Sequence, residues 1–328
     1  MTGKDHATSV IICVHTLERW KEIREAVRSA QLQCPPVREI VIVVDYNDEL
    51  LSRLEYDFPD LTIIANRETP GLSGARNTGV KATKSPLLFF LDDDAVADPA
   101  CVRQLCNYFS HPHVLGATSK IIPLWQVRRP AWFPDEFLWV VGCTYHGMRP
   151  GPVRNILGAS MCLSREMFDA VGGFSHHLGR TRGTLPMGGE ETEICIRAKR
   201  AFPLGVFLFD DKALTRHNVR GERLTWRYFT RRCYAEGISK ARLANLSRSM
   251  ESLTTERDFC VKVLPRAFAR ALGSGILKFD SGQVGCAFAI AVGLGCAMAG
   301  FVVGKLGGAK VDSEMGAVPR IDVPTGEH

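Results

Sequence analysis

Three consecutive acidic residues, Asp92, Asp93 and Asp94, follow the apolar run Leu87–Leu91 directly. Adjacent carboxylates repel one another, and a bound cation is a natural compensation. Mg²⁺ or Mn²⁺ typically takes one or two carboxylates and fills its other positions with phosphate oxygens. We therefore predict that Asp92 and Asp94 bind a divalent cation, the alternative being a solvated acidic turn.

A second group of chemically competent residues lies in the C-terminal half. Glu190 and Glu191 follow two glycines at a predicted helix start, where a carboxylate could deprotonate a hydroxyl as a general base. Acidic residues also favour helix N-termini because of the helix dipole, which is the alternative explanation. His217 follows the apolar run at 205–210 and could be a third metal ligand, although a lone histidine is more often structural.

Asp45 and Arg76 complete the set. Asp45 ends the run Glu39–Val44, where it could accept hydrogen bonds from a base or a ribose hydroxyl, or cap the next helix. Arg76 follows the glycine-containing turn Gly71–Ala75. Its fork of donors suits phosphate recognition, the alternative being a solvent-facing residue at a helix start.

These residues require a scaffold that brings strand ends together. Four short apolar runs alternate with segments of helical spacing, which predicts an α/β fold with a mostly parallel, doubly wound sheet. Ligands of such sheets bind beyond the carboxyl ends of the strands. The predicted strands are Ser9–Val14, Glu39–Val44, Leu61–Ala65 and Leu87–Leu91, with later ones at 158–163 and 205–210. The segments Cys13–Thr16, Asp45 and Asp92–Asp94 lie at such ends.

The segment 121–153 changes character and is rich in Trp, Pro and Arg. We expect it to be irregular, with Trp125, Trp132 and Trp139 either stacking on sugar or lipid or filling the core. Residues 176–189 contain four glycines and predict a loop.

The C-terminal third combines basic and apolar segments. Residues 223–280 predict basic amphipathic helices at a membrane surface. Residues 281–306 predict a transmembrane helix, since 284–304 carry no charge and about twenty residues cross a bilayer. Basic residues before this segment favour the cytoplasmic face of the membrane, with a single-pass or peripheral anchor. A buried helical hairpin is the alternative, and residues 307–328 predict a disordered tail.

Composition narrows the functional classes. Of 328 residues, 45 % are hydrophobic and 23 % charged, which is typical of a globular protein. The net charge of +6 without a single-sign tract gives no reason to expect a nucleic-acid partner. The eleven cysteines form no CxxC pair, which favours free thiols in a reducing compartment over a zinc site. Residues 1–8 are polar and predict no secretory signal.

Taken in order, these motifs resemble family 2 glycosyltransferases, which are inverting enzymes of the Rossmann-like GT-A fold. The resemblance covers about residues 8–220 and implies a catalytic domain over 1–222. It rests on Ser9–Thr16, the strand ending at Asp45, Ala75–Gly79, Phe90–Asp94 and Gly189–Arg197.

The resemblance implies a nucleotide diphosphate sugar donor, a Mn²⁺ or Mg²⁺ cofactor, and a lipid-linked or glycan acceptor at a membrane. It implies a role for each matching residue. The donor contacts would be Cys13, His15, Thr16, Asp45, Arg76, Asp92 and Asp93, the metal ligands Asp92, Asp94 and His217, and the base Glu191.

Two positions depart from the family pattern. The family usually has Pro-Thr-Tyr-Asn where this chain has Cys13–Thr16, and it usually has Asp at Glu191, which leaves Glu190 as a second possible base. Two other functions remain open at this point, a nucleotidyltransferase and a non-enzymatic, membrane-tethered scaffold that binds a cation. A nucleotidyltransferase would normally carry a glycine-rich basic loop after the first strand, where this chain has Cys13–Thr16.

Overall fold

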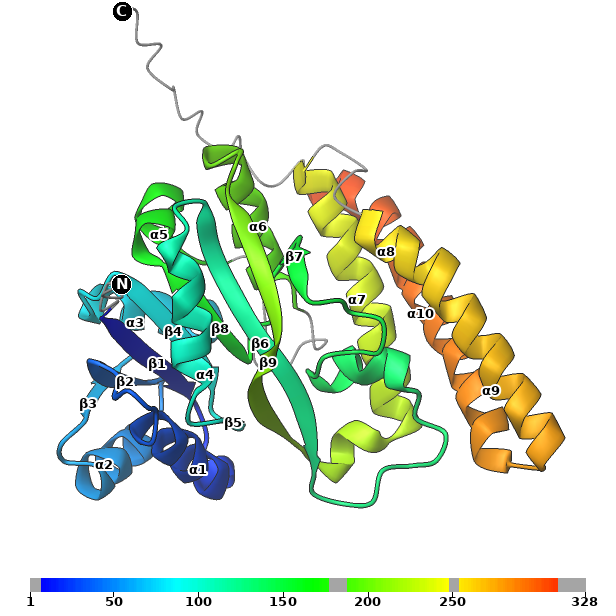
Figure 1. The fold of residues 1–328 in the computed structure, drawn as a ribbon, viewed down its shortest axis with the longest axis horizontal. Coiled ribbons are helices and arrows are strands. Elements are labelled where there is room, and N and C mark those ends of the chain that lie inside the picture. Colours follow the sequence, from blue (N-terminus) through cyan, green and yellow to red (C-terminus); the bar gives the residue numbers. More distant parts are fainter. Residues whose placement is uncertain (1–6, 177–187, 248–253, 312–328) are drawn as a thin grey trace, which may run out of the picture.

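The structure is a computed structural model that describes residues 7–176, 188–247 and 254–311. Figure 1 shows a twisted sheet flanked by helices, beside which a group of long C-terminal helices stands as a separate layer. The sheet has nine strands in the order β3-β2-β1-β4-β8-β6-β9-β5, and β7 pairs with β9. The α/β prediction is confirmed.

The first part of the sheet is parallel and consists of β1 (Thr8–Val14), β2 (Glu39–Val44), β3 (Thr62–Ala65) and β4 (Leu87–Asp92). Strands β1, β2 and β4 are almost wholly buried because helices cover both faces. Val10 and Ile12 belong to one hydrophobic cluster and Ile11 to another, as expected for side chains that alternate across a strand. Polar residues stand at or directly after the carboxyl ends of β1, β2 and β4, on one edge of the sheet. A ligand-binding site can form at this edge.

The helices of this part follow their strands. They are η1 (Leu17–Arg19), α1 (Trp20–Gln31), α2 (Asp48–Asp57) and α3 (Leu72–Ala82). Helix α1 packs Ile23, Ala26 and Val27 into the first hydrophobic cluster, as expected for the apolar face of an amphipathic helix. Helix α3 begins at Leu72, so Arg76 lies in its second turn rather than at its start.

The second part of the sheet is mixed. Strand β8 (Ser160–Ser164) is antiparallel to both β4 and β6 (Val114–Trp125), while β6 is parallel to β9 (Val206–Val219). Two short strands, β5 (Ala95–Ala97) and β7 (Gly151–Val153), pair antiparallel with β9. Strand β6 was not predicted, and its last residues through Trp125 belong to the segment that was expected to be irregular. Strand β9 runs beyond the predicted 205–210 to Val219, so His217 lies inside a strand and not after one.

The connections of this part are α4 (Cys101–Cys106), η2 (Asn107–Ser110), η3 (Asp135–Val141), α5 (Arg165–Val171) and α6 (Glu190–Ala201). The predicted loop 176–189 falls mostly on 177–187, which lie outside the described residues. Helix α6 begins after Gly189, whose φ of 117° is in the left-handed region that favours glycine.

The C-terminal layer contains η4 (Gly221–Leu224), α7 (Trp226–Ser247), α8 (Thr254–Asp258), η6 (Phe259–Val263), α9 (Leu264–Lys278) and α10 (Ser281–Val311). Helix α10 lies against α7 through small residues. A Cβ on Gly300 would come within 2.0 Å of the Tyr234 carbonyl oxygen, and one on Gly237 within 2.0 Å of the Ala297 carbonyl oxygen. This close approach is the contact expected of small residues between apolar helices.

Within the described part of the chain, one helix, Ser281–Leu306, is long and apolar enough to cross a membrane by length and composition. A third of its most apolar window is buried inside the protein. The helix continues to Val311, and the rest of the predicted disordered tail, 312–328, lies outside the described residues.

Candidate active site

Three potential metal ligands from two strands meet at the carboxyl edge of the sheet. Asp92 ends β4, Asp94 follows it, and His217 reaches the same point from β9, with ligand atoms that all lie within 4.8 Å of one another. The Nε2 atom of His217 is 3.0 Å from Oδ1 of Asp94. Carboxylate and imidazole ligands suit Mn²⁺ and Mg²⁺-type sites with open positions. The structure thus brings together the three residues that the sequence singled out.

Two arginines that the sequence analysis did not select surround these carboxylates. Nη1 of Arg19 donates to Oδ1 of Asp93 at 2.6 Å, and Nη2 of Arg223 donates to Oδ2 of Asp94 at 3.3 Å. Arg19 lies in η1 and Arg223 in η4, so no local pattern links them to the acidic residues. Both arginines compensate part of the buried negative charge.

The buried carboxylates titrate in opposite directions. Burial raises the pKa of Asp93, the Asp94 charge adds to this, and Arg19 offsets it only in part, so that the pKa reaches about 7. Burial alone would also raise the pKa of Asp94, but His217, Arg223 and Arg19 outweigh it and hold the pKa well below its usual range. Oδ2 of Asp93 is buried without a hydrogen bond among the described residues. A buried acceptor without a hydrogen bond fits a cation nearby.

Arg76 links the acidic turn to the second acidic pair. It is only 2 % exposed, so the alternative of a solvent-facing arginine is wrong. Its Nη1 donates to Oε1 of Glu191 at 3.0 Å, and its Nη2 lies 3.4 Å from Oδ1 of Asp92. Burial by itself lowers the pKa of Arg76, but Glu191, Asp92 and Glu190 outweigh this and raise it. A permanently charged guanidinium therefore stands between the metal ligands and the acidic helix start.

The two glutamates at the start of α6 differ in solvent exposure. Glu190 is 3 % exposed and 3.7 Å from Arg76, whereas the Glu191 side chain is 17 % exposed. Gly158 makes room for Glu191, because a Cβ there would lie 1.8 Å from its Oε1. Both glutamates line the cavity described below.

Asp45 is also a buried, hydrogen-bonded carboxylate. It accepts from the backbone N–H of Gly71 at 3.0 Å and from Nδ2 of Asn66 at 2.8 Å. The cap of α2 is instead Asn47, which accepts from the N–H of Leu50. The alternative of Asp45 as a helix cap is therefore wrong, and the residue stands at the edge where β2 ends.

The segment after β1 faces the acidic turn. Nδ1 of His15 lies 3.7 Å from Oδ2 of Asp93, and Thr16 caps η1 by accepting from the N–H of Glu18. Burial raises the pKa of Cys13 to about 12 despite the nearby Arg76, so its thiol is neutral at physiological pH. All eleven cysteines are free thiols.

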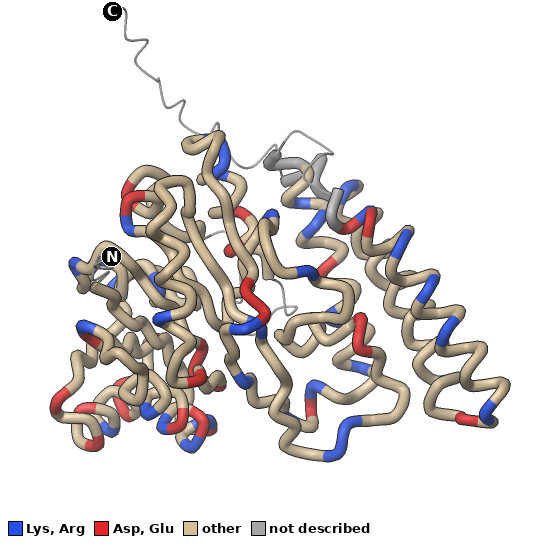
Figure 2. Tube along the Cα trace, in the orientation of Figure 1, with Lys and Arg blue, Asp and Glu red and all other residues tan. Residues whose placement is uncertain are grey.

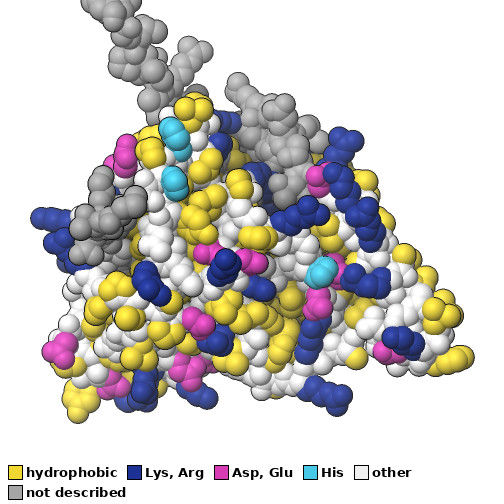
Figure 3. Space-filling model, viewed as in Figure 1, with side chains coloured by type: hydrophobic (Ala, Val, Ile, Leu, Met, Phe, Trp, Pro, Cys, Tyr) yellow, Lys and Arg dark blue, Asp and Glu magenta, His cyan; other side chains and the backbone are white. Residues whose placement is uncertain are grey.

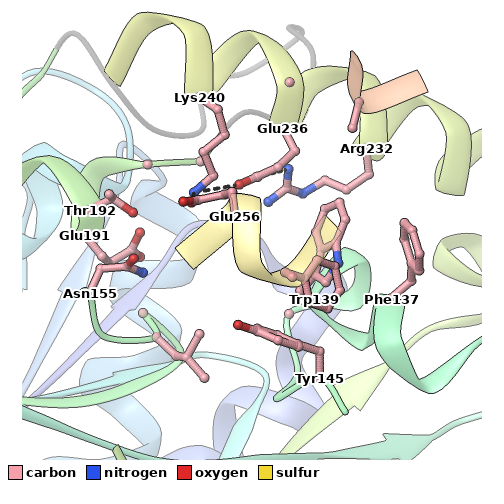
Figure 4. A pocket seen from close by; sticks show the side chains of 18 of the residues that line it. Phe137, Trp139, Tyr145, Asn155, Glu191, Thr192, Arg232, Glu236, Lys240 and Glu256 are labelled. Atoms are coloured by element: carbon pink, nitrogen blue, oxygen red, sulfur yellow. Dashed lines mark hydrogen bonds and ion pairs between the residues drawn. The ribbon is translucent and has the colours of Figure 1, made fainter. Parts of the chain in front are cut away.

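A cavity of about 520 Å³ opens beside this edge and runs under the C-terminal helices. Arg76, Asp92, Glu191 and His217 line one end of it. Figure 4 shows Glu191 and Asn155 at one side, Trp139 and Phe137 at the other, and Lys240, Glu236 and Glu256 across the space between. Apolar side chains of η6, α9 and α10 complete the wall, among them Phe259, Leu264, Leu294, Met298, Phe301 and Val302.

The three tryptophans have different surroundings. Trp132 stacks on Trp226 with ring centroids 4.1 Å apart, and Trp125 packs edge-on against Phe133, so both fill the C-terminal hydrophobic cluster. Trp139 lines the cavity with the guanidinium of Arg232 5.6 Å from its ring centre. Of the three, Trp139 is the one with access to a ligand in this cavity.

Comparison with known proteins agrees with this geometry. The family model of glycosyl transferase family 2 matches residues 9–172. The chain is 31 % identical over 238 residues to a glucosyl-dolichyl phosphate glucuronosyltransferase of Haloferax volcanii, which covers 71 % of this chain and 75 % of that protein.

Two solved structures share the fold. A mannosyltransferase of Pyrobaculum calidifontis, determined with GDP-mannose and Mn²⁺, superimposes with a TM-score of 0.57 at 14 % identity, covering 90 % of this chain and 86 % of its own. GalNAc-T7, determined with UDP, GalNAc and Mn²⁺, gives a TM-score of 0.51 at 18 % identity over 74 % of this chain and half of its own. The fold is therefore GT-A. The chain belongs to glycosyl transferase family 2 and is a glycosyltransferase.

Proposed function

We propose that this protein is an inverting, metal-dependent glycosyltransferase that moves a sugar from a nucleotide diphosphate to a lipid-linked acceptor. The observation that carries the proposal is the convergence of Asp92, Asp94 and His217 beside the Arg76–Glu191 pair at one end of a largely apolar cavity. Family membership argues against a nucleotidyltransferase and against a scaffold without activity.

A divalent cation fits the donor set of Asp92, Asp94 and His217, as judged from their ligand types and mutual distances. When bound, Mn²⁺ or Mg²⁺ supplies Lewis-acid stabilisation of the negative charge on the departing nucleoside diphosphate. The related structures from Pyrobaculum and of GalNAc-T7 were both determined with Mn²⁺. Arg76 is placed to contribute to the same charge from the protein side.

The donor would lie along the edge of the parallel strands. Cys13, His15, Thr16 and Asp45 would contact the nucleoside, because parallel sheets bind ligands beyond their carboxyl ends. Asp92 and Asp93 would face the diphosphate and the sugar. Asp45 already accepts two kinds of N–H donor in the free protein, which shows that its oxygens are oriented by Gly71 and Asn66.

Glu191 is the proposed base. It is more accessible than Glu190, lines the cavity, and is oriented by Arg76. Glu191 would take the proton from an acceptor hydroxyl as the oxygen attacks the anomeric carbon from the face opposite the diphosphate. This displacement inverts the anomeric configuration. An acceptor phosphate would already be ionised and would need no such proton transfer.

The acceptor side of the cavity favours a lipid. Its wall contains apolar side chains of η6, α9 and α10, and the Haloferax relative is named for a glucosyl-dolichyl phosphate acceptor. An acceptor with a long isoprenoid chain could bury that chain against these helices and gain about 0.8 kcal/mol per buried CH₂ group.

We further propose that α9 and α10 bind the cytoplasmic face of the membrane peripherally. Ile276, Leu277 and Phe279 at their junction are 61 %, 82 % and 96 % exposed. Figure 2 shows basic residues spaced along α9, and Figure 3 shows basic side chains beside hydrophobic ones on the same part of the surface, a pattern that suits anionic headgroups. Crossing the bilayer is less compatible with the close α7–α10 contact, because it would draw the charged residues of α7 into the membrane.

The test is turnover of nucleotide diphosphate sugars with a membrane extract as acceptor source. We expect transfer that stops with EDTA and returns with Mn²⁺ or Mg²⁺. Wild-type transfer that survives complete metal removal would contradict the proposed metal dependence.

A further inference from the structure

Five charged residues form a chain along one wall of the cavity, and we call them the α7 charge cluster. They come from three segments: Arg154 follows β7, Arg232, Glu236 and Lys240 belong to α7, and Glu256 belongs to α8. All five line the cavity that also contains Glu191. Figure 4 shows Lys240, Glu236, Glu256 and Arg232 directed toward the same space.

The members of the α7 charge cluster alternate in sign. Arg232 donates to Glu236 at 2.8 Å, and Lys240 lies 3.2 Å from Glu236 and 2.8 Å from Glu256. Arg154 then forms a bidentate pair with Glu256 at 2.5 and 2.6 Å. The spacing of Arg232, Glu236 and Lys240 by four residues places them on one face of α7.

The cluster contains three cations and two anions. Its side chains are only 12–27 % exposed, so the excess positive charge is held largely away from water. Burial alone would raise the pKa of Glu236, but Lys240 and Arg232 outweigh it and lower the pKa to about 2. Burial alone would also raise the pKa of Glu256, but Lys240 and Arg154 outweigh it and lower this pKa as well. Both glutamates are therefore ionised at neutral pH, and the five residues together carry one net positive charge.

A partly buried cavity wall with a net positive charge favours an anionic ligand. Among the described residues, the hydrogen bond of the Arg232 guanidinium to Glu236 engages one of its five N–H donors. Arg232 also lies beside Trp139, whose ring faces the cavity. A planar, multiply donating cation next to an aromatic ring suits a phosphate attached to an organic group.

We propose that the α7 charge cluster is a phosphate subsite, in which Arg232 and Lys240 bind the phosphate of an isoprenoid lipid acceptor. The apolar side chains of η6, α9 and α10 would receive the isoprenoid chain, and the group to be glycosylated would lie toward Glu191 at the other end. The inference rests on the proposed lipid acceptor and defines which part of the cavity recognises which part of it.

A purely structural role for the cluster makes a different prediction. Arg154 and Glu256 connect segments that are 102 residues apart, so the cluster also contributes to holding α8 in place. If that were its only role, substitutions would lower the melting temperature without changing the preference for a phosphorylated lipid.

The experiment measures binding of three probes to the full-length protein in detergent without metal or nucleotide sugar. The probes are farnesyl phosphate, farnesol and inorganic phosphate, measured by isothermal titration calorimetry. We expect farnesyl phosphate to bind at least about 10-fold more tightly than farnesol, because charge-assisted hydrogen bonds are among the strong ones. Inorganic phosphate should bind far more weakly, because it lacks the apolar chain.

Arg232→Gln and Lys240→Gln should each reduce the preference for farnesyl phosphate over farnesol by about 10-fold. The double variant Arg232→Gln/Glu236→Gln removes one charge of each sign, so it leaves no new unpaired charge if a single variant fails to fold. Arg129→Gln is the matched control, since Arg129 pairs with Asp135 and does not line this cavity.

Equal affinity of the wild type for farnesyl phosphate and farnesol would overturn the inference. An unchanged preference in the folded double variant would do the same. Inorganic phosphate that binds as tightly as farnesyl phosphate would indicate a free anion site and not a lipid phosphate site. None of these outcomes depends on turnover, so failure here is distinguishable from an absence of metal-dependent glycosyl transfer.

Discussion

The two sides of the active-site cavity are built on opposite principles. On the sheet side, Asp45 and Asp92 to Asp94 stand directly after apolar strands, and their positions follow from the ends of neighbouring parallel strands. On the helical side, the α7 charge cluster unites α7, α8 and the segment after β7. In the proposed function, the sheet edge would carry the metal and the donor, whereas the helical layer would contact the acceptor.

Substitutions on the two sides of the cavity should have different effects. Substitutions at the sheet edge should affect the transfer step and the donor, since these residues are the proposed ligands of the metal and the diphosphate. Substitutions in the helical layer should affect acceptor choice and membrane binding and should leave donor binding intact.

Asp94→Asn should reduce turnover by at least about 10³-fold, because removing a metal ligand forfeits several kcal/mol of charge stabilisation. It should also weaken binding of a nucleoside diphosphate in the presence of Mn²⁺, as measured by calorimetry. Asp57→Asn is the control, since Asp57 ends α2 and pairs with Arg53 far from the metal ligands. A variant Asp94→Asn with near-normal turnover would remove Asp94 from the metal site.

Glu191→Gln should reduce transfer to a sugar hydroxyl by about 10²–10⁴-fold, the usual contribution of a general base. Donor binding should change little, because the proposed role of Glu191 is to accept a proton from the acceptor. Transfer to a lipid monophosphate should be reduced much less, since that nucleophile is already ionised. Comparing the two acceptors in one kinetic series would also identify the acceptor class.

Glu190→Gln is the matched control for the base. It makes the same Glu-to-Gln substitution at the preceding residue, whose carboxylate is more buried. If Glu190→Gln abolishes transfer while Glu191→Gln is active, the base has been assigned to the wrong neighbour.

Gly158→Ala should reduce turnover by about 10²-fold without unfolding the protein, because its Cβ would lie 1.8 Å from Oε1 of Glu191 and displace it. Gly295→Ala is the control, since a Cβ there meets nothing within 4 Å in the described structure. Kinetics and melting temperature measured together separate displacement of the base from loss of stability. Unchanged turnover in Gly158→Ala would show that the position of Glu191 is not critical.

Phe279→Asp should weaken binding to vesicles that contain anionic lipid by about 10-fold or more, since burial of a Phe side chain contributes roughly 1.5–3 kcal/mol. Tyr56→Asp is the control, because Tyr56 is 83 % exposed on α2, far from the C-terminal helices. Vesicle co-sedimentation at low and high salt measures the effect. Equal loss in both variants, or full-length protein that never binds vesicles, would contradict the peripheral anchor.

Much of the sheet side was predictable because its rules are local. Apolar runs of strand length and the polar residues that end them are visible in the chain, as are the glycines before α6. For the same reason Asp92, Asp94, Arg76 and Glu191 could be singled out, and the structure brings Arg76 and Glu191 into contact across 115 positions. The order of the motifs along the chain also indicated that these separate patterns belong to one site, which no single residue could indicate.

Other features were decided only by the tertiary structure, because they depend on contacts between segments with no shared pattern. Arg19 and Arg223 reach the acidic turn from two unremarkable 3-10 helices, and Asp45 is engaged by Gly71 and Asn66 while Asn47 caps the helix. The length of β9 follows from pairing with β6, and this places His217 inside a strand.

The C-terminal region shows most clearly which features the sequence alone does not determine. Its sequence determined that α10 is apolar and long enough to span a bilayer, since hydropathy depends on composition alone. Only the packing showed that Gly300 and Gly237 bring α10 against α7 and that its side chains Leu294 and Met298 line the cavity of Glu191. Which face of an apolar helix meets lipid and which meets protein depends on shape complementarity with a distant segment, and that information is absent from the helix itself.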